Sequence, residues 1–194
     1  YVCAWLRNPK NKQKPLEEIR SVISESRRLG IDILPPSIKN VPATNFFIKD
    51  KSVYFGLDSI KGCGEKSIAK LIELDIDLES TSWLEFLVLY SKLINKTNII
   101  NMIRTGCFDY MGRSRMECEF MYNQWAILTL TENKKAVDLY KRKLHMSLTK
   151  LLGDFLEIAS KNRKPVIQSI IDTLQNSPVD LNDSKDNIVA HEKQ

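Results

Sequence analysis

The chain has 194 residues, 43% of them hydrophobic, which is enough to build one ordinary domain or two small ones. Charged residues interrupt every apolar stretch well short of the roughly 20 residues that a membrane span needs, so a membrane protein is excluded and we expect a soluble one. The formal net charge is +5, and basic residues concentrate in segments 1–30 and 131–164; this distribution indicates contact with a polyanion, although a solvated helix face gives the same count.

The cysteines and the first residues of the sequence indicate the cellular compartment in which we expect the protein. The four cysteines are spaced singly, unlike the pairs of a zinc site, and only two histidines are present, so we predict no metal site. Free thiols suit the reducing cytoplasm, because disulfides persist mainly in oxidising compartments. The sequence begins at Tyr1, without Met or a signal peptide; we therefore expect a cytoplasmic protein, and a fragment or processed product of a longer one.

A helix is predicted within the first 30 residues. Pro15 occupies a typical first-turn position, apolar residues recur at helical spacing through Ile23, and Gly30 provides a left-handed stop. The proline pair at 35 and 36 then imposes extended backbone on residues 31–36, because proline fixes its own geometry and restricts the residue before it.

A short β-hairpin is predicted next. Residues 46–48 and 53–55 are aromatic or β-branched, and they flank the polar turn Lys49-Asp50-Lys51. We expect this hairpin to be the only β structure of the chain.

The segment from Leu57 to Ile72 has the pattern of a helix-hairpin-helix. An apolar turn leads into glycine, an apolar residue and glycine, and a new helix begins at once. The glycines allow a tight bend, and the amides at the start of the second helix lie at the positive end of its dipole, so a phosphate can bind there. The residues predicted to bind DNA phosphates at this first hairpin are Lys61, Gly62, Cys63, Gly64, Lys66 and Ser67.

We expect this hairpin to hold a duplex by its backbone, without reading bases, so that affinity falls steeply with salt. The Cys63 side chain should be a buried apolar plug, while Lys61 and Lys66 reach neighbouring phosphates. The alternative is an ordinary helical turn that ends in a glycine cap.

A second hairpin is predicted after a helical segment at 98–103. Residues 106–112 form a longer glycine-bounded turn, and a helix begins after Ser114. The predicted DNA contacts there are Gly106, Gly112, Arg113 and Arg115. Two such units, joined by a helix at 83–93, would hold both strands across the minor groove. A capped pair of antiparallel helices gives much the same pattern, and this alternative stays open.

The remaining helices are predicted from caps and apolar spacing. Capping boxes place helix starts at Trp83 and Arg115. Apolar residues then step by three and four over residues 137–158, which predicts one long amphipathic helix, and Pro165 starts another that runs to Leu174. Residues 176–187 are polar and acidic, typical of a linker or tail.

We predict no catalytic residue and no cofactor in this chain. Asp75 and Asp77 have the spacing with which a polymerase strand presents carboxylates to magnesium, but no strand pattern flanks them and no third acid joins them, which favours a solvated loop. His145 lacks a carboxylate, cysteine or serine partner for acid–base or nucleophilic chemistry. The tryptophans are spread singly, which favours core packing over base stacking.

Over about residues 1–125 the chain resembles the C-family replicative DNA polymerases, the alpha subunits of bacterial DNA polymerase III. The matching blocks are SRRLGIDILPP at 26–36, YFGLDSIKG at 54–62, NK at 95–96 and TGCFD at 105–109. The chain departs from the family pattern at Ser37, Cys63 and Cys107, where the family usually has an acidic, a β-branched and a small residue. Past Trp125 the resemblance fades.

The resemblance implies that residues 1–56 are the end of the polymerase fingers and 57–125 a tandem helix-hairpin-helix that holds product duplex. It also implies that the palm carboxylates, and the magnesium that the whole polymerase uses, belong to a part of the polymerase outside this chain. Contact with a sliding clamp is implied by the family, although we find no clear clamp-binding segment.

We therefore expect a mainly α fold: a short β-hairpin, the tandem helix-hairpin-helix, a basic amphipathic helical region at 126–175 and a polar acidic linker or tail at 176–194. As a whole the protein would be a DNA-directed DNA polymerase, and this part of it would bind primer-template DNA without catalysis. Two alternatives remain: a separate helix-hairpin-helix adaptor of repair or recombination, and a helical protein-interaction module, which would show no salt-dependent duplex binding.

Overall fold

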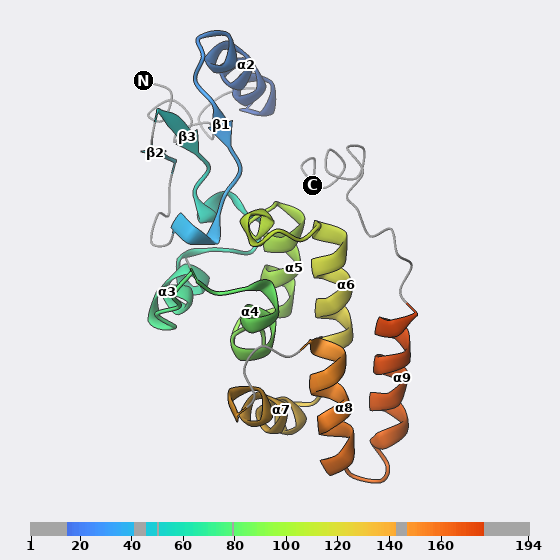
Figure 1. The fold of residues 1–194 in the computed structure, drawn as a ribbon. Helices are drawn as coiled ribbons and strands as arrows, with labels where there is room; N and C mark the ends of the chain where they lie inside the picture. Colours follow the sequence, from blue (N-terminus) through green and yellow to red (C-terminus); the bar gives the residue numbers. More distant parts are fainter. Residues whose placement is uncertain (1–14, 41–45, 50, 79, 143–146, 177–194) are drawn as a thin grey trace.

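The computed structural model describes residues 15–40, 46–49, 51–78, 80–142 and 147–176. In these residues the protein is mainly α-helical with one small sheet, as predicted (Figure 1). Within the same ranges, no helix combines the length and the hydropathy that a membrane span requires. His145 and residues 177–194 of the predicted tail lie outside the described residues.

The N-terminal part consists of one helix against a three-stranded sheet. Helix α2 (Pro15–Arg28) ends at a left-handed Gly30 with φ of 72°, as predicted. The predicted hairpin is present as β2 (Phe47–Lys49) and β3 (Ser52–Tyr54), which pair antiparallel. A small apolar cluster centred on the buried Val53 joins the helix to the sheet.

The sheet also contains a strand that we did not predict. Strand β1 (Ile33–Leu34) lies in the extended segment before the prolines and pairs in parallel with β3. The amide of Val53 donates to the carbonyl of Asp32 at 2.8 Å, and this pairing gives the extended backbone a partner. The expectation that the hairpin is the only β structure is therefore wrong. The segment before the prolines is extended, as predicted, and its backbone groups pair with the edge of β3 that β2 leaves free.

Short helices form the middle of the chain, below the sheet in Figure 1. The serines of both predicted capping boxes cap helices: the Ser82 hydroxyl accepts from the Glu85 amide at 3.2 Å and the Ser114 hydroxyl from the Glu117 amide at 3.1 Å. The elements are η3 (Leu57–Ser59), α3 (Glu65–Glu73), α4 (Trp83–Leu89), η4 (Ser91–Leu93), α5 (Lys96–Arg104), η5 (Asp109–Met111) and α6 (Arg115–Ala126), where η denotes a 3₁₀ turn.

The C-terminal region corrects one prediction. The single helix expected over 137–158 is wrong, because α7 (Leu130–Arg142) and α8 (Leu148–Ile158) are separate helices. The Ser147 hydroxyl caps α8 by accepting from the Lys150 amide at 3.3 Å. Both helices bury their apolar faces in the same core, so the apolar spacing continues across the break. Helix α9 (Lys164–Gln175) follows as predicted and packs beside α8 (Figure 1).

One hydrophobic core runs through the described residues from Ile38 to Ile171. It therefore crosses the boundaries we predicted after residues 56 and 125. Trp83 and Trp125 are buried in this core, in agreement with the packing role predicted for them, and Trp5 lies outside the described residues. The Trp83 ring meets that of Phe108 edge-on at 5.1 Å between centroids, which fixes the second hairpin against α4.

Candidate nucleic-acid interface

The first hairpin is a tight turn between η3 and α3. Gly62 has a φ of 89°, a backbone conformation that favours glycine. The Cys63 amide donates to the Ile60 carbonyl at 3.0 Å, and its side chain is only 2% exposed. Cys63 is thus the apolar plug that we predicted, but its amide is occupied within the turn, so the predicted phosphate contact would not come from this amide. The element before the turn is a single 3₁₀ turn rather than a full helix.

Helix α3 begins without a side-chain cap. Its N-cap residue is Gly64, with φ of −77° and ψ of 179°. In the part of the chain that the structure describes, the amides of Gly64, Glu65 and Lys66 donate to no protein group. Unpaired amides at the positive end of a helix dipole form a site for an anion such as phosphate.

Two asparagines of α5 hold this hairpin in place. The side-chain amide of Asn101 donates to the Lys61 carbonyl at 2.6 Å, and that of Asn98 donates to the Ser67 hydroxyl at 2.6 Å. The Ser67 hydroxyl in turn donates to the Gly62 carbonyl at 3.5 Å. The hairpin is therefore cross-linked to α5 through side-chain and main-chain groups.

The asparagine contacts bear on one sequence-based assignment, that of Ser67. The Ser67 hydroxyl is engaged by Asn98 and its amide donates to the Gly64 carbonyl at 2.9 Å, so Ser67, a predicted phosphate contact, helps to shape the hairpin. Asn98 and Asn101 were not predicted. Their spacing of three residues on a predicted helix places both on one face, but only the fold shows that this face meets the hairpin.

Lys61 and Lys66 remain as candidate phosphate contacts, because both side chains are exposed at the hairpin. Glu65 is also exposed and lies in the first turn of α3, where its carboxylate favours the helix dipole but opposes a bound phosphate. The candidate phosphate site thus consists of unpaired main-chain amides with two lysines and one acid around them.

The second hairpin uses its amides internally. The amide of Gly106 donates to the Ile103 carbonyl at 3.0 Å, that of Cys107 to the Met102 carbonyl at 3.0 Å, and that of Gly112 to the Asp109 carbonyl at 3.2 Å. The amides of both predicted glycines are therefore occupied. Gly106 and Gly112 have φ of 86° and 75°, so their role is to shape the turn.

Arg115, a predicted DNA contact, points into the protein in this structure. Its side chain is 8% exposed and donates from Nη2 to Asp109 Oδ2 at 2.7 Å and from Nη1 to the Arg104 carbonyl at 3.1 Å. A Cβ atom on Gly106 would lie 2.4 Å from Arg115 Nη2. Gly106 thereby leaves room for the guanidinium group. Arg113 stays at the surface, where it forms an ion pair with Glu117.

The second hairpin also anchors the N-terminal part. The amide of Ile38, in η2 (Ile38–Asn40), donates to the Cys107 carbonyl at 3.2 Å, and the Lys39 ammonium lies 4.7 Å from the centre of the Tyr110 ring. Ile38 is fully buried. The two hairpins thus differ: the first leaves the amides at the start of α3 without a described acceptor, whereas the Gly106, Cys107 and Gly112 amides of the second are bonded within it.

Burial keeps two thiols neutral. It raises the pKa of Cys63 to about 11 and raises that of Cys107 still further above its ordinary value. At neutral pH both are uncharged apolar side chains, consistent with packing roles in the two hairpins.

Comparisons with known proteins agree with this geometry. Residues 30–118 match the family model described as a helix-hairpin-helix motif. A stretch of 102 residues, 52% of this chain, is 33% identical to the DNA polymerase III subunit alpha of Chlamydia pneumoniae and covers 8% of that protein. The subunit alpha of Aquifex aeolicus is 30% identical over 60% of this chain and 10% of its own length.

A third relative, the DNA polymerase III subunit alpha of Deinococcus radiodurans, is 26% identical over 52% of this chain and 8% of its own length. These matches span about a tenth or less of the relatives. They confirm the resemblance of this chain to the alpha subunits of bacterial DNA polymerase III and the presence of a helix-hairpin-helix motif.

Proposed function

We propose that this chain is the part of a replicative DNA-directed DNA polymerase that holds primer-template duplex by its backbone phosphates and carries no catalytic group itself. The observation that supports this most is the uncapped start of α3, where the amides of Gly64, Glu65 and Lys66 have no acceptor among the described residues. The matches to polymerase alpha subunits supply the kind of polyanion that would bind there.

The hairpin would hold one phosphate by main-chain hydrogen bonds. The left-handed Gly62 and the side-chain-free Gly64 let the backbone approach a DNA strand closely. Phosphate oxygens would accept from the unpaired amides, and Lys61 and Lys66 would act as point charges on neighbouring phosphates. Because these groups would contact phosphates only, binding would be independent of DNA sequence.

The asymmetry of the hairpins refines the tandem grip predicted from the sequence. The first hairpin would contact DNA. The second would hold η2 through the Cys107 carbonyl and would contain the ion pair between Arg115 and Asp109. We therefore propose one DNA-binding hairpin with a structural partner, in place of two equivalent grips.

The catalytic parts of the polymerase would lie elsewhere. Within the described ranges, no group of three or more histidine, cysteine or acidic side chains could hold a metal ion. We propose that the magnesium of the whole enzyme is bound by carboxylates of another part of the polymerase, that the enzyme acts in the cytoplasm, and that any sliding-clamp contact involves other segments.

Substitutions at Gly64 test the proposal without disturbing the fold. A Cβ at Gly64 meets nothing within 4 Å, and the backbone there suits any N-cap residue. Gly64→Ala keeps the amides free, whereas in Gly64→Asp the new carboxylate accepts from a first-turn amide and repels phosphate. We expect Gly64→Asp to weaken binding of a primer-template duplex about 10-fold or more, with helix stability equal or slightly higher.

The measurement is fluorescence anisotropy over a salt series, with thermal unfolding of each variant as a check of the fold. Gly64→Ala should bind like the wild type and show the same decline of affinity with salt. Equal binding by all three proteins would remove the hairpin from the DNA contact. If the wild type shows no salt-dependent duplex binding at all, the chain is a protein-interaction module instead.

A further inference from the structure

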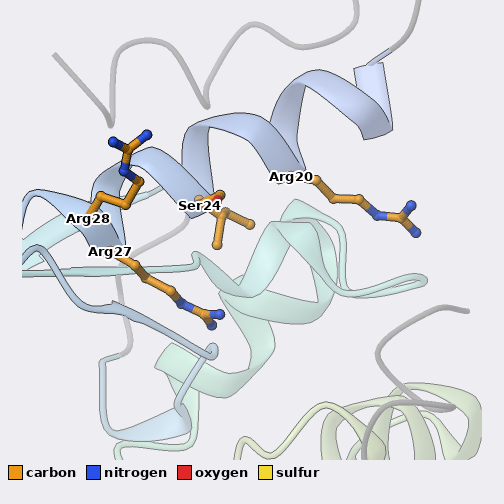
Figure 2. A pocket seen from close by; sticks show the side chains of 5 residues that line it. Arg20, Ser24, Arg27 and Arg28 are labelled. Atoms are coloured by element: carbon orange, nitrogen blue, oxygen red, sulfur yellow. The ribbon is translucent and has the colours of Figure 1, made fainter.

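An open hollow on the surface of α2 is lined by arginines. Its lining residues are Arg20, Ile23, Ser24, Arg27 and Arg28 (Figure 2). This helix lies at the opposite end of the described structure from α8 and α9, beyond the sheet (Figure 1). The hollow is thus separate from the hairpin described above.

The arginines of this hollow are arranged on one face. Arg20, Ser24 and Arg27 follow each other at intervals of four and three residues, which places them on the same side of a helix. Figure 2 shows the side chains of Arg20 and Arg27 extending to the same side of α2, with Ser24 between them, while the guanidinium group of Arg28 points away.

Within the segments that the structure describes, two of these guanidinium groups have no protein partner. Arg20 and Arg27 are exposed and form no ion pair with any other residue in the described segments, whereas Arg28 pairs with Glu25 at 3.4 Å. A basic residue in the last turn favours the helix dipole, which accounts for Arg27 and Arg28. It does not account for Arg20, which lies near the middle of the helix.

We propose that Arg20, Ser24 and Arg27 bind a backbone phosphate of the same DNA that the first hairpin holds. This inference rests on the proposed function. Two planar guanidinium groups and a hydroxyl group are donors that suit the oxygens of a phosphodiester, and guanidinium groups can bind them in pairs. The hollow is open at the surface, which suits a backbone phosphate rather than an enclosed base or nucleotide.

The contact would lengthen the DNA-binding surface of the chain. Because α2 lies on the far side of the sheet from the helices around the first hairpin, it would reach a phosphate at another position along the duplex (Figure 1). Since only phosphate is contacted, this second contact would add affinity and salt dependence without adding sequence specificity.

The double variant Arg20→Gln/Arg27→Gln tests this contact. Its control is Lys150→Gln/Lys161→Gln, which removes the same charge from two exposed positions, one in the first turn of α8 and one between α8 and α9. Both proteins are titrated with a primer-template duplex of about 24 base pairs. Between about 50 and 200 mM salt, the affinity of the wild type should fall about 3- to 12-fold more than the affinity of the arginine variant. This difference corresponds to the loss of one or two phosphate contacts in the variant. The lysine variant should keep the wild-type salt slope, and so should Arg20→Lys/Arg27→Lys.

The Gly64→Asp variant in the same assay separates this inference from the proposed function. If Gly64→Asp weakens binding while the arginine and lysine variants have equal slopes, the hairpin contact stands and the α2 contact is wrong. If the wild type shows no salt-dependent binding, both are wrong.

Titration with inorganic tripolyphosphate distinguishes a free anion from DNA. Wild-type binding of tripolyphosphate that the arginine variant loses, together with unchanged DNA binding, would assign the hollow to a free phosphate compound and overturn the proposal. Loss of salt-dependent DNA affinity in the arginine variant alone, with an unchanged thermal unfolding curve, supports it.

Discussion

Asn98 of α5 donates its side-chain amide to the hydroxyl group of Ser67 on α3 at 2.6 Å, across 31 positions of sequence. The same asparagine is 7% exposed, and its Oδ1 atom lies 2.9 Å from the position that a Cβ on Gly62 would take. The buried side chain of Asn98 on α5 thus contacts α3 through Ser67 and packs beside Gly62, the glycine of the first hairpin turn.

Asn98→Ala should destabilise the protein and loosen the first hairpin. Removal of the buried donor leaves the Ser67 hydroxyl with one partner fewer, and we expect the free energy of unfolding to fall by about 1–3 kcal/mol. Urea unfolding measures this loss, and anisotropy should show weaker duplex binding. In a double-mutant cycle with Ser67→Ala the two effects should not add; strictly additive losses would show that the pair is not coupled.

Gly106→Ala should cost far more stability than Gly112→Ala. Both glycines have positive φ, which costs an alanine about 1–2 kcal/mol. At Gly106 the new Cβ would also meet Arg115 Nη2 at 2.4 Å and Asp109 Oδ2 at 2.6 Å, whereas nothing lies within 4 Å at Gly112. Thermal unfolding compares the two variants, and equal midpoints would contradict the close packing of Arg115 against Gly106.

Glu65→Gln should increase the affinity for DNA and lower stability slightly. The carboxylate lies in the first turn of α3, beside the amides proposed to bind phosphate, so its removal relieves a like-charge repulsion. It also removes a favourable interaction with the helix dipole, worth about 0.3–1 kcal/mol. Anisotropy at low salt and urea unfolding measure the two effects. Exposed Glu157→Gln on α8 is the matched control and should leave the affinity unchanged.

Glu132 should make stability depend on acid pH. Arg163 donates to its carboxylate from Nε at 2.7 Å and from Nη2 at 3.0 Å, and this pairing holds the pKa of Glu132 at about 2 instead of 4.5. A lowered pKa in the folded state means that the stabilisation is complete above about pH 5 and is lost as the pH falls towards 2.

We expect this contribution to be about 1–3 kcal/mol at neutral pH. The measurement is urea unfolding of wild type and Glu132→Gln at pH 7 and pH 3. The difference in stability between the two proteins should shrink at the lower pH. A difference that stays constant with pH would show that the carboxylate is not held by Arg163 in the folded state.

Local patterns accounted for most of the helices. Ser82 and Ser114 marked helix starts, and Gly30 marked a stop, because caps and left-handed turns depend on the chemistry of a few neighbouring residues. The prediction failed over 137–158, where apolar spacing could not show that two separate helices, α7 and α8, contribute to the same core.

The candidate phosphate site likewise has features that the sequence predicted and features that it did not. The amino-acid sequence alone determined the glycine turn, the apolar plug at Cys63 and the exposed lysines beside it, because a turn of this kind depends on neighbouring residues. Only the tertiary structure decided that Asn98 clamps the first hairpin, that Arg115 turns inward to Asp109, and that the Cys107 carbonyl accepts from the Ile38 amide. Whether a polar side chain meets solvent or another part of the chain depends on which elements pack together over long sequence separations, and single-sequence patterns do not contain that information.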